Sequence, residues 1–156
     1  MLYFKLGNVF HAPRSFSLAH CISQDTSVGL FKGISVQFLR MYPQLHSLRS
    51  ETVTLGSAEP VKVDKIFIYN LISKPTYWSK PKLKIFEETL MSMFNHACSN
   101  GVTDIAAPRL GSGLDKLDFD HNVYPLILKY FGSTRVNLHV FSLNVVDHIS
   151  TIIRYF

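Results

Sequence analysis

Cysteine and charge are both scarce in this 156-residue chain. The only cysteines, Cys21 and Cys98, lie far apart and form no C-x-x-C pair. We therefore expect buried thiols rather than a disulfide framework or a zinc site. Charged residues make up only 17% of the chain, too few for a disordered segment of high net charge. The seven histidines show none of the spacings of zinc enzymes, so we expect no metal and no cofactor.

Long apolar runs are also missing. No stretch approaches the ~18 consecutive apolar residues of a membrane helix, and residues 1–8 lack the apolar run of a signal peptide. We expect a soluble intracellular monomer, cytoplasmic or nuclear, with no membrane partner. Hydrophobic residues, at 47%, suffice for the core of one ordinary domain covering residues 1–156.

Acidic residues are outnumbered, which gives the chain a basic balance. Lys and Arg total 16 against 11 Asp and Glu, a formal charge of +5 with a pI near 9.3. A basic surface favours polyanions in general and does not choose among nucleic acids, phosphates and nucleotides. The basic residues are scattered, and the densest stretch is Lys74 to Lys84. Dedicated nucleic-acid binding is therefore not expected.

Apolar periodicity predicts strands that alternate with helices. The expected strands cover residues 2–6, 17–22, 65–72, 103–107 and 135–143, and the expected helices cover 33–42, 81–99, 118–131 and 145–155. Pro125 is expected to delay or kink the third helix, and residues 44–63 are poorly defined. This order is typical of a three-layer α/β/α fold with a mostly parallel sheet.

The last expected helix belongs to a C-terminal extension, residues 144–156. Its apolar residues fall on one stripe, formed by Val146, Ile149, Ile152 and Ile153. Such a helix would cover one face of the sheet.

Three loops that follow expected strands could bind a ligand at one edge of the sheet. They cover residues 23–33, 73–80 and 108–115. The first and third contain glycines, which let backbone N–H groups approach phosphate oxygens. Gly111-Ser112-Gly113 taken alone is more typical of a plain turn.

Four blocks of sequence resemble, in order, those of macrodomains. They are residues 17–25 (SLAHCISQD), 33–35 (GIS), 71–74 (LISK) and 107–115 (APRLGSGLD). The blocks are most similar to those of the terminal ADP-ribose protein glycohydrolase subgroup. Residues 6–10 (LGNVF) also resemble the first loop of that group. The resemblance implies a mixed six-stranded sheet between helices, with ADP-ribose in a cleft at its edge.

The same resemblance implies a set of ligand contacts. Asn8 stands where the group usually has an acidic residue that accepts a hydrogen bond from adenine. An amide oxygen can accept this bond, but without charge assistance. The implied binding residues are Asn8, Val9, Ser23, Gly33, Ile34, Ser35, Arg109, Gly111, Ser112, Gly113, Leu114, Phe141 and Leu143.

Lys74 and Asp115 fall on the two positions that carry catalysis in the subgroup. The implied activity removes mono-ADP-ribose from glutamate and aspartate side chains of modified proteins and extends to O-acetyl-ADP-ribose. A neutral lysine amine can attack the anomeric carbon of the distal ribose and expel a carboxylate. An aspartate can then move protons as general acid and base. Taken without the resemblance, Lys74 would be a solvated charge and Asp115 a cap or turn residue.

Two other functions stay open. Between Asp25 and the first helix, residues 26–32 (TSVGLFK) are longer and bulkier than the usual glycine-rich form. This change, together with Asn8, is compatible with an ADP-ribose reader that has lost turnover. A phosphatase acting on ADP-ribose 1″-phosphate is the other alternative.

Overall fold

The computed structural model describes residues 1–25, 33–48, 51–111 and 117–155. These residues form one six-stranded sheet in the order β1-β6-β5-β2-β4-β3. The strands are β1 (Leu2–Leu6), β2 (Ser17–Ser23), β3 (Ala58–Val63), β4 (Ile66–Lys74), β5 (Asp104–Pro108) and β6 (Asn137–Ser142). All neighbouring strands run parallel except β3, which pairs with β4 in the antiparallel direction. The predicted mixed, mostly parallel sheet is confirmed.

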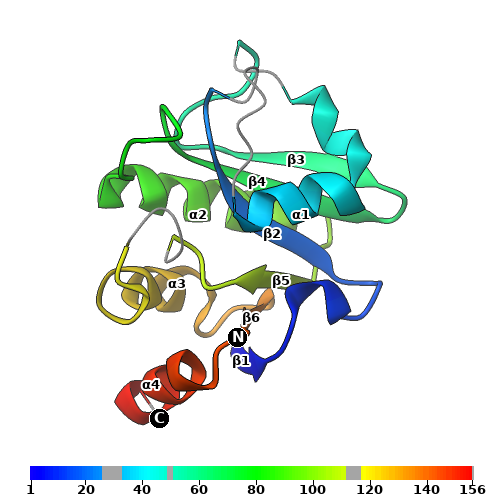
Figure 1. The fold of residues 1–156 in the computed structure, drawn as a ribbon. Helices are drawn as coiled ribbons and strands as arrows, with labels where there is room; N and C mark the ends of the chain where they lie inside the picture. The colour runs from blue at the N-terminus through cyan, green and yellow to red at the C-terminus, as the bar shows by residue number, and fades with distance from the viewer. Residues whose placement is uncertain (26–32, 49–50, 112–116, 156) are drawn as a thin grey trace.

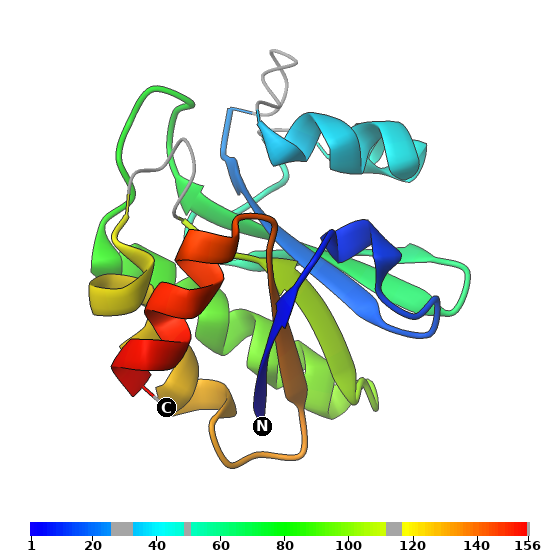
Figure 2. The same ribbon diagram turned by 60° about the horizontal axis from the view of Figure 1, so that its bottom comes forward.

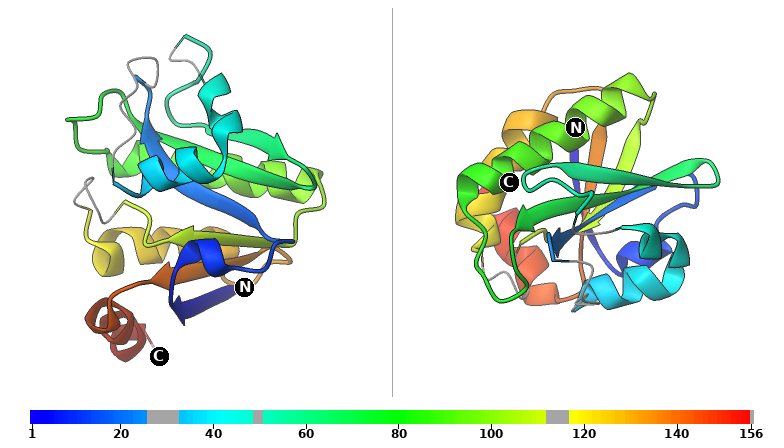
Figure 3. Two further views of the ribbon diagram at one scale, coloured as in Figure 1. Left: turned by 45° about the vertical axis from the view of Figure 1, so that its right-hand side comes forward. Right: turned by 90° about the horizontal axis from the view of Figure 1, so that it is seen from above.

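Helices cover both faces of the sheet and make a three-layer molecule (Figures 1 and 3). The α-helices are α1 (Ile34–Met41), α2 (Leu83–Ser99), α3 (Tyr124–Phe131) and α4 (Val145–Tyr155). One core cluster joins the sheet to α2 and α3, with Phe86, Leu90 and Phe131 fully buried. The second cluster lies on the opposite face and includes Phe38 of α1. The predicted three-layer arrangement is confirmed.

The second helix shows why sequence periodicity succeeded here. Phe86, Leu90, Met93 and Ala97 recur at three or four residues, and all four are fully buried. The helix ends at Ser99, and Gly101 follows with φ +67°, a conformation that glycine adopts without strain.

The third helix begins late, at Tyr124, which agrees with the delay expected at Pro125. A π-helical turn, η4 (Phe119–Val123), precedes it, and α3 starts at Tyr124 with Pro125 in its first turn. Proline fits this position because its missing N–H would have no partner inside the helix.

The last helix forms as predicted, but the face that it buries is its polar face and not its apolar stripe. It packs beside β1 and β6 at the edge of the sheet (Figure 2). Thr151 on its polar face is fully buried, whereas Val146 and Ile153 are 73% and 77% exposed. The apolar stripe therefore does not cover a face of the sheet.

Two expectations about composition can be compared with the structure. Cys21 and Cys98 are free thiols, as predicted, but both are only partly buried. None of the described helices has both the length and the hydrophobicity to cross a bilayer.

Candidate functional site

The carboxyl ends of the parallel strands meet at one edge of the sheet. β2 ends at Ser23 and β4 at Lys74, and these two residues are partners in the register. β5 ends at Pro108, which pairs with Phe141 of β6. The loops that the sequence singled out therefore begin on the same side, which is where parallel α/β sheets bind ligands.

Lys74 is a buried lysine at this edge. Its side chain belongs to the last residue of β4, and the residue is only 6% exposed. The Nζ amine donates a hydrogen bond to the backbone oxygen of Tyr77 at 3.0 Å. The alternative of a solvated surface charge is therefore wrong, because a lysine is buried only when its amine has partners.

Hydrogen bonds join the loop after β2 to the loop after β4. The backbone N–H of Gln24 donates to the oxygen of Lys74 at 2.8 Å. The Ser23 hydroxyl donates to one carboxylate oxygen of Asp25. The other oxygen accepts from the Tyr77 backbone N–H at 3.3 Å. Ser23 and Lys74 thus belong to one hydrogen-bonded network that joins the two loops.

The start of α1 offers backbone N–H groups to a ligand. Gly33 precedes the helix with φ +59° and ψ −133°, a conformation essentially restricted to glycine. Gly33, as the N-cap residue, has no side chain that could cap this helix end, and N–H groups at a helix N-terminus favour anions such as phosphate. The predicted contacts at Gly33 and Ile34 therefore fall on a backbone suited to them.

Ser35 has a structural side chain. Its hydroxyl donates to the backbone oxygen of Cys21 at 3.0 Å and faces Nδ1 of His20 at 3.2 Å. Nε2 of His20 lies 2.6 Å from Oδ1 of Asn70. Burial lowers the pKa of His20 to about 4. His20 is thus a core histidine, as expected. The Ser35 hydroxyl links α1 to β2 through its hydrogen bonds.

The first loop lies beside the end of β6. The backbone N–H of Gly7 donates to the oxygen of Ser142 at 2.8 Å. Oδ1 of Asn8 accepts from the N–H of Phe10 at 3.0 Å, capping η1 (Val9–His11). The amide oxygen predicted to accept from adenine therefore already accepts one bond, and a second lone pair remains.

The three apolar residues assigned to the adenine end differ in exposure. Val9 is 3% exposed and lies in the core, so only its backbone could contact a ligand. Phe141 is partly buried, and the Lys5 amine lies 5.9 Å from the centre of its ring. Leu143 is 73% exposed. Phe141 is thus the best placed of the three to pack against a base.

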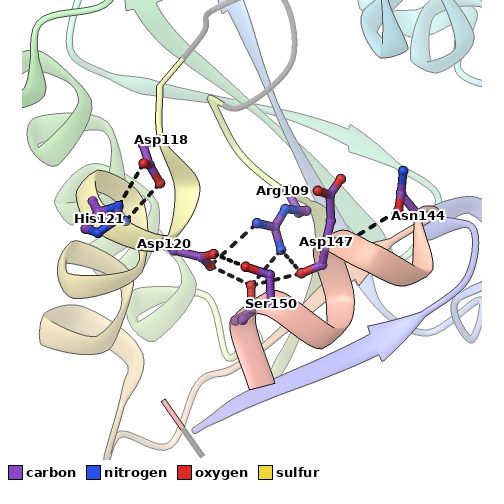
Figure 4. A network of polar contacts seen from close by, with 8 residues as sticks. Arg109, Asp118, Asp120, His121, Asn144, Asp147 and Ser150 are labelled. Atoms are coloured by element: carbon purple, nitrogen blue, oxygen red, sulfur yellow. Dashed lines mark hydrogen bonds and ion pairs between the residues drawn. The ribbon is translucent and has the colours of Figure 1, made fainter. Parts of the chain in front are cut away.

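Arg109 has a role that differs from the predicted one (Figure 4). Its Nη1 donates to Oγ1 of Thr151 at 2.7 Å and to the backbone oxygen of Asp147 at 3.1 Å. Its Nη2 lies 3.5 Å from Oδ1 of Asp120. The guanidinium also lies 4.3 Å from the centre of the Phe119 ring. The side chain joins α4 to η4, where a ligand contact was expected.

The glycine turn after β5 is described only at its two ends. Gly111 has φ +74°, and its oxygen accepts from the Leu117 N–H at 2.8 Å. A Cβ at Gly111 would lie 2.9 Å from Cδ1 of Leu117, and the positive φ itself favours glycine at this position. The remaining predicted residues of this turn, Ser112, Gly113, Leu114 and Asp115, lie outside the described residues.

Two features of this edge were missed by sequence reasoning. One is the Asp120 and Thr151 pair, whose oxygens lie 2.6 Å apart in a buried hydrogen bond. The other is Tyr77, whose backbone holds both Lys74 and Asp25. The only signal for Tyr77 was its closeness to Lys74 in the chain. Its contacts use backbone atoms, which every residue type has.

Comparisons with known proteins identify relatives of this chain. The chain matches no family model. It is similar to "ADP-ribose glycohydrolase OARD1" of Homo sapiens, with 36% identity over 137 residues and 88% of each chain covered. The Bos taurus protein of the same name is 35% identical over 137 residues, again with 88% of each chain covered.

Solved structures support the same fold. The macrodomain of Mycobacterium tuberculosis DarG has a TM-score of 0.78 at 22% identity, with 90% of this chain and 97% of that chain covered. Thermosipho africanus DarTG in complex with ADP-ribose has a TM-score of 0.76 at 18% identity, with coverage of 89% and 41%.

Proposed function

The chain belongs to the macrodomain family of ADP-ribose glycohydrolases, and on this premise we propose that it removes mono-ADP-ribose from glutamate and aspartate side chains. The observation that carries the proposal is the position of Lys74. It is buried at the carboxyl end of β4 beside Ser23, at the edge where the ligand loops meet. A relative in this fold is named as a complex with ADP-ribose, which supports ADP-ribose as the ligand.

The proposed reaction uses Lys74 as a nucleophile. Its neutral amine attacks the anomeric carbon of the distal ribose, so that a C–N bond forms and the ester C–O bond breaks. The acceptor leaves as a carboxylate, and Asp115 accepts the proton released by the amine. Water then cleaves the adduct: its oxygen bonds to the anomeric carbon as the C–N bond breaks, and Asp115 returns its proton to the lysine nitrogen. The remaining water proton passes to solvent, and free ADP-ribose and the neutral lysine are regenerated.

Release of ADP-ribose from a glutamate-linked modified protein tests the proposal. Lys74→Ala and Asp115→Ala should each abolish release, because each removes a group that the reaction needs. Lys65→Ala is the matched control, since Lys65 is an exposed lysine at the opposite end of β4. Inactive wild-type protein, or full activity in Lys74→Ala, would refute the enzyme.

A non-catalytic reader is the second candidate, and Asn8 favours it. This residue replaces the carboxylate that usually binds adenine, and its oxygen also caps η1. Calorimetry with ADP-ribose separates the two functions. Binding by wild-type protein without any ester cleavage would establish the reader and exclude the enzyme.

A further inference from the structure

The only tryptophan of the chain is a surface residue. Trp78 is 71% exposed and lies in the loop between β4 and α2. Tryptophan carries a large apolar surface that is normally buried. Exposed tryptophan and tyrosine side chains dominate binding energy at protein interfaces. Its exposure four residues after Lys74 therefore calls for a partner near the site.

Hydrogen bonds fix the backbone of the loop around Trp78. The Ser79 N–H donates to the oxygen of Thr76 at 3.2 Å, and the Ser79 hydroxyl donates to the same oxygen at 2.8 Å. The preceding residue, Tyr77, is bonded to Lys74 and Asp25. The Tyr77 and Trp78 rings meet edge to face at 5.0 Å. A loop whose backbone is fixed before binding loses less entropy when a partner contacts it.

The reaction places the modified polypeptide close to this loop. The bond that breaks is at the carbon attacked by the Lys74 amine, and this amine lies 3.0 Å from the oxygen of Tyr77. Trp78 is the next residue, with its Cα about 3.8 Å from that of Tyr77. A polypeptide joined to the distal ribose would therefore leave the site beside the loop that carries Trp78.

Three exposed lysines follow Trp78. Lys80, Lys82 and Lys84 are all exposed. Among the described residues none of the three forms an ion pair. Lys82 is the N-cap residue of α2 and Lys84 lies in its first turn, which contains no acidic residue; Glu87 and Glu88 follow one turn later. Positive charge at a helix N-terminus is destabilising, and an acidic partner would offset it.

We propose that Trp78, Lys80, Lys82 and Lys84 form an acceptor strip that binds the polypeptide around the modified residue and selects acidic sequences. The inference rests on the proposed function, because it assigns the leaving side of the same ester. A single-stranded nucleic acid fits less well, since such ligands stack successive bases on several aromatic side chains. Here one exposed tryptophan meets Tyr77 edge-on.

Peptide esters test the acceptor strip. Two peptides of equal length carry ADP-ribose on a central glutamate, one flanked by Asp and Glu and the other by Ser and Gln. We expect the acidic peptide to have the lower KM. Trp78→Ala should raise its KM about tenfold, the loss typical of an interface tryptophan. Hydrolysis of O-acetyl-ADP-ribose, which has no polypeptide, should be unchanged.

Two further variants isolate the contributions of ring and charge. Trp78→Phe should recover part of the lost affinity, because an aromatic ring is retained. The double variant Lys80→Gln, Lys84→Gln should remove the preference for the acidic peptide. Its matched control is Lys62→Gln, Lys65→Gln, which makes the same charge change at two exposed lysines, one in β3 and one in the turn that follows it.

Tryptophan fluorescence keeps the inference separate from catalysis. An uncleavable ADP-ribosyl peptide with acidic flanks should change the Trp78 emission, and ADP-ribose alone should not. This readout works even if no ester is cleaved, so failure of the proposed function remains distinguishable. Equal KM values for both peptides, an equal loss with O-acetyl-ADP-ribose, or a Trp78 effect seen only with ADP-ribosylated oligonucleotides would overturn the acceptor strip.

Discussion

The Arg109–Asp120 ion pair is largely buried, with side chains 13% and 9% exposed. Asp120→Ala would leave the guanidinium buried without its carboxylate, and the hydroxyls of Ser150 and Thr151 would lose their acceptor. We expect the free energy of unfolding to fall by about 3 kcal/mol, as measured by urea denaturation.

An exposed ion pair provides the control for this prediction. Glu87 pairs with Lys129 at 3.2 Å on the surface, and Glu87→Ala should cost much less because water screens such a pair. Equal losses in the two variants would show that burial does not set the value of the Arg109 pair.

His20 should make the protein sensitive to mild acid. Its folded-state pKa is lowered to about 4 by burial, from an ordinary value of 6.5. Below pH 6.5 His20 binds a proton in the unfolded chain, whereas in the folded chain it binds one only near pH 4. The stabilising effect of neutral His20 is therefore complete above pH 6.5 and is lost as the pH falls toward 4. The loss amounts to about 3 kcal/mol.

Urea denaturation between pH 7 and pH 4 measures this loss. His20→Gln should flatten the acid limb of the stability curve, whereas His11→Gln, at an exposed position, should leave its slope unchanged. An identical slope in His20→Gln and wild type would assign the acid sensitivity to other groups.

At the scale of elements, α4 is unusual because it buries a polar residue and exposes its apolar ones. Thr151 is fully buried and bonded to Arg109 and Asp120. Thr151→Val keeps the shape but removes the hydroxyl, so we expect a loss of about 1–3 kcal/mol. Thr151→Ser retains the oxygen and should recover most of this loss. Both values come from thermal or urea unfolding.

The apolar stripe of α4 supplies the opposite control. Val146→Lys and Ile153→Lys alter side chains that are 73% and 77% exposed. Each should change stability by less than about 0.5 kcal/mol. A large loss in either variant would mean that the stripe, not Thr151, holds the helix in place.

Helices and strands with a regular apolar period could be predicted from the sequence. Features that depend on contacts with distant parts of the chain could not. The period of α2 identified Phe86 and Leu90 as core residues, and both are fully buried. β3 was missed because its sequence, AEPVKV, shows a polar edge strand that is recognisable only from its pairing with β4. The orientation of α4 was missed because the partners of Thr151 lie 31 and 42 residues away in the chain.

At the scale of the whole molecule, strand direction was the part of the site that the sequence could predict. Parallel strands bring their following loops to one edge, and the register makes Ser23 and Lys74 partners. Backbone contacts, such as the Tyr77 oxygen that accepts from Lys74, could not be predicted because any residue can supply them. The burial of Arg109 depends on three elements that meet only after folding.

Ligand binding should stabilise the whole molecule, because the loops that meet at this edge come from strands throughout the sheet. ADP-ribose at 100 times its Kd should add about 2.7 kcal/mol to the free energy of unfolding, a rise in Tm of about 5 to 10 °C. Lys74→Ala should keep most of this shift, since the backbone at Gly33 and Gly111 is unchanged by the substitution. Gly33→Val should lose it, because valine cannot adopt the conformation of φ +59° and ψ −133° found there. Thermal unfolding with and without ADP-ribose measures each shift, and an unshifted wild-type Tm would show that this edge does not bind ADP-ribose.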